Sequence, residues 1–328
     1  MNLTDPNSES TPEHNPNEPA ASPETSPENP EIYAWPPAQE PLVPMQTGVV
    51  EYQPAEPAPP RRPPLIPHLG HTAVFFLLMI PSLVVAYIIS FLLFLAIIHP
   101  HSIHILMMNV VHEMRYAIAI QIIWYLVLWA MAAMTFTLWW RRPMTEGVHW
   151  NAPVAGRWFF ALGLTGVLLG LVVSLAGNFL PMPKAPPILE DLTKSQAAAW
   201  LLMGFGISLA PLTEELALRG FILPSFINVF RWFQIRGTIS ESTVRNIGIP
   251  VSIVLTSIPF ALMHAQQVSF SWAPVLLIGV VSVVLCIVRL RNDSVASGVV
   301  VHACYNLTLF TGMLIQTDGF RHLQKLHH

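Results

Sequence analysis

Residues 209–222 read LAPLTEELALRGFI, and they lie within one of the most apolar parts of the chain. AAAWLLMGFGIS precedes this stretch and LPSFINVF follows it, yet the stretch itself contains Glu214, Glu215 and Arg219. An ionisable side chain at the centre of a bilayer costs at least about 2.5–3.5 kcal/mol, so such residues usually face a protein interior and have a function. The stretch therefore predicts a membrane helix that carries a functional site.

The composition of the whole chain is that of a membrane-embedded protein. Of its 328 residues, 53% are hydrophobic and 11% are charged, against about 25% charged in a typical soluble domain. A helix needs about 20 apolar residues to cross the hydrocarbon core. We therefore expect an all-α fold, a polytopic helical bundle with about seven transmembrane helices, at residues 72–98, 116–140, 158–180, 197–221, 249–265, 272–288 and 295–315.

The N-terminal part has a different composition. Residues 1–60 include ten acidic residues and no Lys or Arg, and they are rich in Pro, Glu, Ser and Asn. Such a segment buries too little apolar surface to offset the entropy of ordering it. We expect residues 1–66 to form a disordered, acidic, Pro-rich cytoplasmic tail and residues 67–328 to form the transmembrane domain. No basic segment followed by a short apolar stretch opens the chain, so we expect no secretory signal peptide.

Basic residues predict the orientation, because Lys and Arg accumulate in cytoplasmic loops. With a cytoplasmic N-terminus, ten basic residues lie inside and five lie outside. We therefore expect a cytoplasmic N-terminus and, with seven spans, a C-terminus on the outside. The inside set is Arg61, Arg62, Arg141, Arg142, Arg157, Arg231, Arg236, Arg245, Arg289 and Arg291, and the outside set is Arg115, Lys184, Lys194, Arg321 and Lys325.

Strongly polar side chains within the spans are concentrated in the last four. The first three spans contain only Gln121 and, near an end, Asn178. A concentration of this kind indicates one shared interior site. Its members, on the fourth, fifth and seventh spans, are Glu214, Glu215, Arg219, His264, His302 and Asn306.

Helical spacing assigns different roles to the two adjacent glutamates. Glu215 and Arg219 are four residues apart, so they lie on one helix face and can neutralise each other. Glu214 is turned by about 100° from Glu215 and has no cation in its own helix. Pro211 is expected to interrupt the helix and help to open a polar cavity. We therefore expect a structural role for Glu215 and a chemical role for Glu214.

The remaining polar residues complete a set that can hydrolyse a peptide bond. Burial raises the pKa of a carboxyl group and makes it a better general base, so Glu214 is the candidate base for a water molecule that His264 orients. Phe260 lies one turn before His264 and can pack against its ring. His302 and Asn306 share a helix face and can donate hydrogen bonds to a developing oxyanion.

Other interpretations are weaker. A single buried His is often a packed core residue, and a Glu–Arg pair can simply fix helix register, but polar groups on three separate spans are harder to explain by packing. A transporter is disfavoured because no internal repeat is present. The chain has no Gly-rich phosphate loop and no basic patch interleaved with aromatic residues, so we expect no nucleic-acid partner. Its two cysteines exclude a disulfide framework.

Three motifs resemble those of the CAAX protease and bacteriocin-processing (CPBP, or Abi) family, which includes the Ras-converting CAAX endopeptidases. They are Glu-Glu-x-x-x-Arg at 214–219, Phe-x-x-x-His at 260–264 and His-x-x-x-Asn at 302–306, and the similarity covers about residues 197–315. The resemblance implies an intramembrane endopeptidase in which Glu214 and His264 activate water and His302 with Asn306 forms the oxyanion hole.

The family also indicates the substrates. Its eukaryotic members remove the last three residues of prenylated proteins, and its bacterial members are associated with peptide maturation or with immunity to bacteriocins. The implied partners are the lipid bilayer and a membrane protein or lipid-modified peptide as substrate. The alternative within the same fold is a non-catalytic immunity or scaffold protein.

The resemblance leaves open whether a metal ion takes part, since the family has been called metalloproteases. Glu214, His264 and His302 could together hold Zn²⁺ with an open position for water. Each of these residues also has a role that needs no metal, so we expect that no cofactor is required.

The predicted spans do not place all of these residues at one depth. Counted at about 1.5 Å per residue from the span ends, Glu214 and His302 fall towards the cytoplasmic side and His264 falls nearer the outside. A shared site requires either that the fifth span starts later and protrudes, or that the boundaries differ by more than one helical turn.

Overall fold

The structure is a computed structural model that describes residues 65–98, 113–183 and 195–324. Within these ranges the chain forms helices and turns and no strand, which confirms the all-α prediction. The same ranges contain seven helices that are long and apolar enough to cross a membrane. Contacts divide the chain into residues 1–60 and 61–328, and all of the described helices belong to the second unit. The predicted tail, residues 1–66, lies almost wholly outside the described residues.

The described helices follow the predicted order. The first three spans are α1 (Leu69–Ile98), α3 (Met114–Trp140) and α6 (Phe159–Gly177), with the short α4 (Met144–Gly147) and α5 (Ala152–Arg157) before α6. The fourth span is built from α8 (Gln196–Gly206), α9 (Leu209–Glu215), the π-helix η1 (Leu216–Ile222) and α10 (Leu223–Ile235). The fifth span consists of α11 (Glu241–Thr243), the π-helix η2 (Val244–Gly248) and α12 (Ile249–Met263). After the short η3 (Gln266–Val268), the sixth span is α13 (Trp272–Asn292) and the seventh is α14 (Val295–Gln316).

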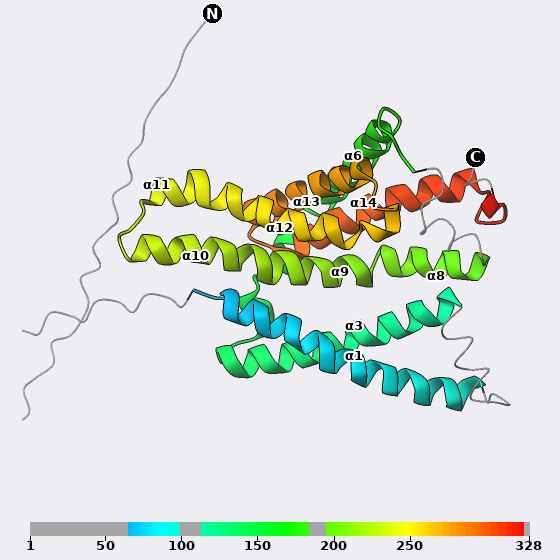
Figure 1. Ribbon diagram of the computed structural model, residues 1–328, viewed down its shortest axis with the longest axis horizontal. Coiled ribbons are helices and arrows are strands. Elements are labelled where there is room, and N and C mark those ends of the chain that lie inside the picture. The colour runs from blue at the N-terminus through cyan, green and yellow to red at the C-terminus, as the bar shows by residue number, and fades with distance from the viewer. Residues whose placement is uncertain (1–64, 99–112, 184–194, 325–328) are drawn as a thin grey trace, which may run out of the picture. The chain divides into compact units, whose positions relative to one another are not determined.

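The fourth span separates two layers of helices. In Figure 1, α8, α9 and α10 follow one another across the view, with α1 and α3 below them and α6, α12, α13 and α14 above. Below the fourth span, the rings of Phe75 and Phe221 stack at 4.4 Å within a buried cluster that also contains Phe136 and Leu216. A second buried cluster joins α6, α13 and α14. The residues of 209–222 are thus at the centre of the bundle.

The packing of α6 on α14 depends on two glycines spaced four apart. A Cβ atom at Gly166 would lie 2.3 Å from the backbone oxygen of Val301, and one at Gly170 would lie 2.8 Å from the Cβ of Thr308. Small residues at this spacing allow two membrane helices to approach closely. The close contact holds α14, with its polar residues, in place against the rest of the bundle.

The fourth span is longer than the sequence predicted. The expected boundaries were 197–221, but the helical segment runs from Gln196 to Ile235, 40 residues. At about 1.5 Å per residue it is about 60 Å long, twice the hydrocarbon thickness of a bilayer. Polar residues in α10, among them Asn228 and Arg231, end the apolar stretch although the helix continues. The segment stops at Gly237 (φ +75°), where a turn closes with a hydrogen bond from the amide of Thr238 to the carbonyl of Phe233.

The fifth span is also longer than predicted, and this corrects the depth of the polar residues. It begins at Glu241 instead of residue 249. The prediction missed its first turns because they contain polar residues. Glu214 lies 22 residues before Arg236, and His264 lies 24 residues after Ser240, on the two arms of one helical hairpin. The two residues therefore reach the same depth. The hairpin extends beyond the neighbouring ends of α1 and α3 (Figure 1).

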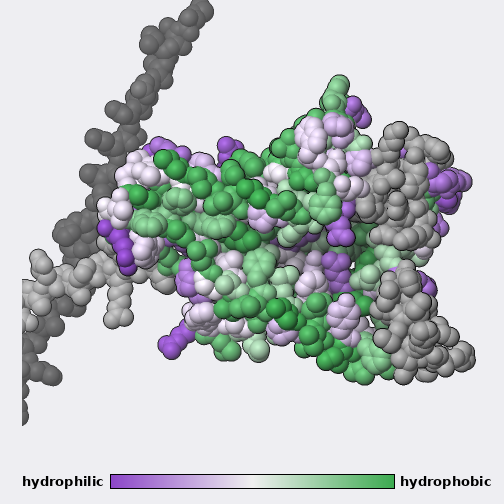
Figure 2. Space-filling view, viewed as in Figure 1, coloured by the Kyte–Doolittle hydropathy of each residue, from purple (hydrophilic) through white to green (hydrophobic). Residues whose placement is uncertain are grey.

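The outer surface of the helices is apolar. Figure 2 shows hydrophobic residues along most of the visible helix sides, and large side chains such as Phe160 and Ile97 are 89% and 74% exposed. A surface of this kind is stable in contact with lipid and not with water. The protein is therefore an integral, multi-pass membrane protein.

Candidate active site

The site begins at a break in the fourth span. Helix α8 ends at Gly206 and α9 begins at Leu209, so the chain breaks just before Pro211, and Pro211 itself lies in the first turn of α9. Proline lacks an amide hydrogen, and its ring clashes with the carbonyl four residues earlier, here that of Ile207. An α-helix cannot continue undisturbed through these residues, and the break leaves room beside Glu214.

The predicted polar residues converge on one cavity of about 280 Å³. Glu214, His264, His302 and Asn306 all line it, together with Phe260. The other lining residues are mostly apolar: Gln121, Leu202, Phe205, Gly206, Ala210, Gln267, Ile278, Val281, Tyr305, Leu309, Phe310 and Met313. The structure thus brings the five lining members of the predicted set together, and their chemical roles stay predictions.

Glu214 is the central group of the cavity. Its Oε2 lies 3.9 Å from Nε2 of His264 and 3.8 Å from Nε2 of His302. These distances exceed a direct hydrogen bond, and the Glu214 carboxylate has no hydrogen bond within the described part of the chain. The side chain is 17% exposed. The carboxylate is therefore held beside two imidazoles with space for a small molecule between them.

Hydrogen bonds at Nδ1 orient both histidines. Nδ1 of His264 lies 2.9 Å from the carbonyl oxygen of Phe260, and Nδ1 of His302 lies 3.0 Å from Oε1 of Glu215. A carbonyl and a carboxylate can only accept, so each Nδ1 carries a hydrogen and each neutral ring has its lone pair on Nε2. Consequently, His302 donates from Nε2 only as an imidazolium.

Asn306 is positioned by the break in the fourth span. Its Nδ2 donates to the carbonyl oxygen of Gly206, the last residue of α8, at 2.7 Å. An amide nitrogen has two hydrogens, and the second has no partner within the described residues. The amide can therefore hold its place on α8 and still donate to a group in the cavity.

A fully buried layer closes the cavity at one end, and we call Glu215, Arg219, Ser282 and Phe260 the ion-pair layer. Nη1 of Arg219 lies 2.8 Å from Oε1 of Glu215, and both side chains are 0% exposed. Nη2 of Arg219 donates to the carbonyl and hydroxyl of Ser282 at 2.9 and 2.7 Å. The guanidinium also lies 4.8 Å from the ring centre of Phe260. Because Glu215 also binds His302, this layer supports the cavity directly.

From this layer the cavity extends towards one end of the bundle. Leu202, in the second half of α8, and Met313, near the end of α14, both line it. The start of α8 and the end of α14 lie on the same side of the bundle in Figure 1, where α12 stops short of them. Phe260 joins the cavity to the ion-pair layer, whose Arg219 lies further along the fourth span towards α10.

Sequence reasoning missed several partners of the site. The contact between Glu215 and His302 joins residues 87 positions apart, and the partner of Arg219, Ser282, is one of many serines in apolar segments. Gln121 was recognised as unusual, but its place in the cavity and its hydrogen bond to the hydroxyl of Tyr125 (3.0 Å) depend on the packing of α3. The only signal for Gln121 was a polar side chain in an otherwise apolar span.

Within the described residues, seven apolar helices and a cavity lined by Glu, His and Asn side chains define a polytopic membrane protein with an intramembrane polar site. Residues 196–308 match the model of a family described as Type II CAAX prenyl endopeptidase Rce1-like. The match covers about a third of the chain and contains all three motifs, which confirms the resemblance to the CAAX proteases. It supports a CAAX-type intramembrane protease at the level of the family. No curated protein and no solved structure matches the chain.

Proposed function

We propose that the protein is an intramembrane endopeptidase that hydrolyses a peptide bond of a membrane-associated protein or lipid-modified peptide. The observation that carries this proposal is the position of Glu214, whose Oε2 lies within 4 Å of Nε2 of both His264 and His302 in a largely apolar cavity. A site excluded from bulk water strengthens each electrostatic interaction within it.

In the proposed reaction, Glu214 is the general base. A water molecule between Oε2 of Glu214 and Nε2 of His264 loses a proton to the carboxylate, and its oxygen forms a bond to the carbon of the scissile amide. The carbonyl oxygen becomes an oxyanion, which accepts hydrogen bonds from Nδ2 of Asn306 and from protonated His302. Collapse of this intermediate breaks the C–N bond, and Glu214 returns its proton to the leaving amine.

We propose that this reaction needs no metal. If zinc were bound, Oε2 of Glu214 and Nε2 of His264 and His302 would hold it, and it would supply a more acidic bound water. Each of these three residues, however, has a role in the proposed reaction that needs no metal. Metal content and chelator sensitivity of the purified active protein test this point, and activity lost on zinc removal and restored by zinc would overturn it.

The shape of the cavity supports an apolar substrate segment. Beyond the polar groups its walls are built from side chains such as Phe205, Leu309 and Phe310. These can enclose apolar side chains next to the scissile bond, and the burial of each such side chain stabilises the complex by about 1.5–3 kcal/mol before ordering costs.

The direct test uses the protein in liposomes with a library of apolar, internally quenched peptides. Wild-type protein is expected to cleave some of them, and Glu214→Gln is expected to cleave the same peptides at least about 10²-fold more slowly. Glu241→Gln, which removes an exposed carboxylate far from the cavity, is the matched control and should keep full activity. In cells, membrane-protein C-termini that stay uncleaved when this gene is deleted would identify substrates.

The alternative, a non-catalytic immunity or scaffold protein, makes the opposite prediction. Wild-type and Glu214→Gln proteins would then give the same peptide profile in liposomes, and deletion of the gene would leave the C-termini unchanged. Either pair of results decides between the two functions.

We also propose that the N-terminus is cytoplasmic, from the ratio of ten basic residues to five. In that orientation the cavity extends towards the non-cytoplasmic face. Cysteine labelling tests this: with Gln267→Cys at the cavity and Thr238→Cys in the hairpin, a membrane-impermeant maleimide should label only the first in intact cells. The reverse pattern would give the opposite orientation.

A further inference from the structure

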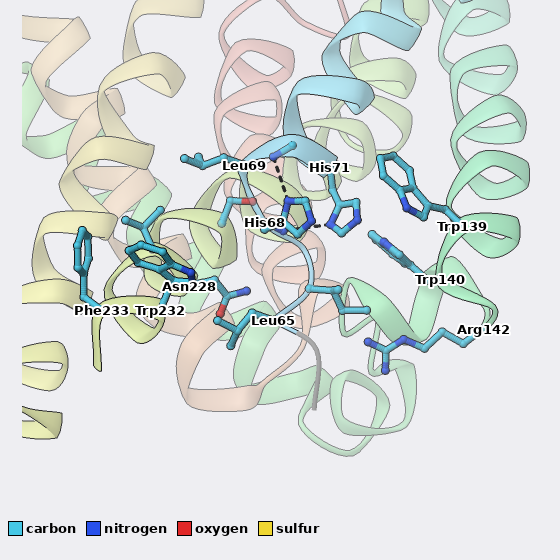
Figure 3. Close-up of a pocket in the computed structure, with 14 residues that line it drawn as sticks. Leu65, His68, Leu69, His71, Trp139, Trp140, Arg142, Asn228, Trp232 and Phe233 are labelled. Atoms are coloured by element: carbon cyan, nitrogen blue, oxygen red, sulfur yellow. Dashed lines mark hydrogen bonds between the residues drawn. The ribbon is translucent and has the colours of Figure 1, made fainter. Parts of the chain in front are cut away.

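A second cavity lies at the opposite end of the bundle from the active-site mouth. It has a volume of about 820 Å³ and opens between the start of α1, the end of α3 and α10 (Figure 3). We call it the interfacial pocket, because Leu69 begins one span and Trp140 ends the next. Its lining residues are Leu65, Ile66, His68, Leu69, Gly70, His71, Trp139, Trp140, Arg142, Ser225, Asn228, Val229, Trp232 and Phe233.

The two histidines of the pocket are hydrogen-bond donors. The backbone amide of His68 donates to Nδ1 of His71 at 3.2 Å, and that of Gly70 donates to Nδ1 of His68 at 3.1 Å (Figure 3). A backbone amide can only donate, so each Nδ1 accepts and each neutral ring carries its hydrogen on Nε2. His71 is only 3% exposed, yet its Nε2 has no hydrogen-bond partner within the described residues. This donor, on a residue that is otherwise buried, points to a ligand that accepts hydrogen bonds.

The charged residues around the pocket also favour an anionic ligand. Arg142 lines it, and Arg236 stacks on the lining residue Trp232, 3.8 Å from the ring centre. Among the described residues, no Asp or Glu lines the pocket. Glu146 contacts Arg142 at 3.3 Å, but its side chain is 62% exposed to solvent, so this contact contributes little. The pocket therefore combines several donors and positive charge without an acidic group on its walls.

The rim of the pocket is aromatic. Trp139, Trp232 and Phe233 are 51%, 42% and 39% exposed, and Figure 3 shows them on opposite sides of the two histidines. Tryptophan at the end of a membrane span lies at the level of the lipid head groups. A ligand with an apolar part and an anionic head therefore fits this pocket better than a free inorganic ion.

We propose that the interfacial pocket binds the phosphate-containing head group of an anionic membrane phospholipid. Arg142 and Nε2 of His68 and His71 hold the phosphate, and the aromatic rim contacts the start of the acyl chains. Basic pockets between membrane helices bind acidic lipid head groups in this way. This site is separate from the active-site cavity and does not depend on the proposed peptidase activity.

Native mass spectrometry of the purified full chain tests the proposal. Phosphatidylglycerol is expected to bind more tightly than phosphatidylcholine with the same acyl chains. Arg142→Gln should weaken phosphatidylglycerol binding by about tenfold or more, since it removes a charge-assisted contact. Arg157→Gln removes an exposed arginine outside the pocket and should bind as the wild type does.

His68→Ala provides a second variant in case Arg142→Gln folds poorly. It removes one Nε2 donor from an exposed residue and keeps the backbone amide that binds His71, and it should also weaken binding. Equal phosphatidylglycerol binding by wild type and a folded pocket variant would overturn the proposal. So would complete displacement of the lipid by millimolar inorganic phosphate, because the site would then bind free phosphate.

Discussion

The active-site cavity and the ion-pair layer lie side by side, and each contains one of two adjacent glutamates. Glu215 makes contacts of 2.8 and 3.0 Å with Arg219 and His302 and is fully buried. Glu214 is 3.8 Å or more from its nearest His nitrogens and is partly exposed to the cavity. Close pairing fixes the position of a charge, whereas a loosely surrounded carboxylate can still exchange a proton with a bound molecule. The ion-pair layer with Glu215 therefore has a structural role, and the cavity with Glu214 has the proposed chemical role.

The largest effect is expected for Glu214→Gln. The amide keeps the size of the side chain but cannot accept the proton of water, so turnover should fall by about 10² to 10⁴, as for the loss of a general base. Because Glu214 has no close partner, the thermal unfolding temperature should stay near that of the wild type. If this variant cleaves at the normal rate, Glu214 is not the general base, and the two glutamates do not differ in the way described above.

Glu215→Gln is expected to affect stability first and activity second. Removing one member of a buried ion pair typically costs about 3–5 kcal/mol, because the other charge remains unpaired. Replacing Arg219 with Met in the same protein should recover part of the unfolding temperature. Activity should not return with it, since His302 has still lost the carboxylate at its Nδ1. A stable but inactive Glu215→Gln variant, together with a Glu214→Gln variant that cleaves at the wild-type rate, would show that the two glutamates have exchanged roles.

Gly298→Ala tests how tightly the ion-pair layer is packed. A Cβ atom at Gly298 would lie 2.6 Å from Oε2 of Glu215, and overpacking of this kind typically costs about 1–3 kcal/mol. Gly312→Ala, on the same helix, is the matched control, because a Cβ atom there has nothing within 4 Å. The measurement is the unfolding temperature of both variants, and equal values would show that the layer is not tightly packed.

The smallest effect is expected at a similar ion pair in contact with water. Arg289 and Asp293 are also four residues apart, at 2.9 Å, and the Arg289 side chain is 5% exposed, but that of Asp293 is 66% exposed. Burial raises the pKa of Asp293, yet hydrogen bonds from His149 and Arg289 outweigh this and hold the pKa below its ordinary value of 3.8. The stability from this pair is thus present above pH 3.8 and is lost as the pH falls through the lower, folded-state pKa.

Asp293→Asn should therefore lower the unfolding temperature slightly at pH 7, by an amount equivalent to at most about 1 kcal/mol. The difference from the wild type should shrink as the pH falls below 3.8. An effect as large as that of Glu215→Gln would mean that burial does not distinguish the two pairs.

The sequence was sufficient for the fold class and for the order of the spans, because long apolar helices have a strong compositional signal. It was not sufficient for the lengths of the fourth and fifth spans, since α10 and η2 are helices with polar residues, such as Asn228 and Arg245. Helix formation continues there without the continuous apolar stretch that identifies a span. The corrected lengths then place Glu214 and His264 at one depth.

The candidate site was predictable in its members and not in its contacts. Spacing along one helix predicts that Glu215 and Arg219 meet, as they do at 2.8 Å. The partners contributed by other helices, such as the carbonyl of Gly206 for Asn306, depend on how α8 and α14 pack. Sequence spacing carries no information on such contacts between distant segments.

The π-helix η1 also limits how the length of this chain can vary. Between Leu216 and Ile222 the hydrogen bonds join residues five apart, so this turn contains one residue more than an α-helical turn. The wide turn already absorbs this extra residue, so inserting one more residue there would rotate everything after it by about 100° relative to Glu214. Phe221 would then leave its stacked position on Phe75. Related chains of this fold should therefore differ in length at the hairpin turn around Gly237 and keep the number of residues between Glu215 and α10.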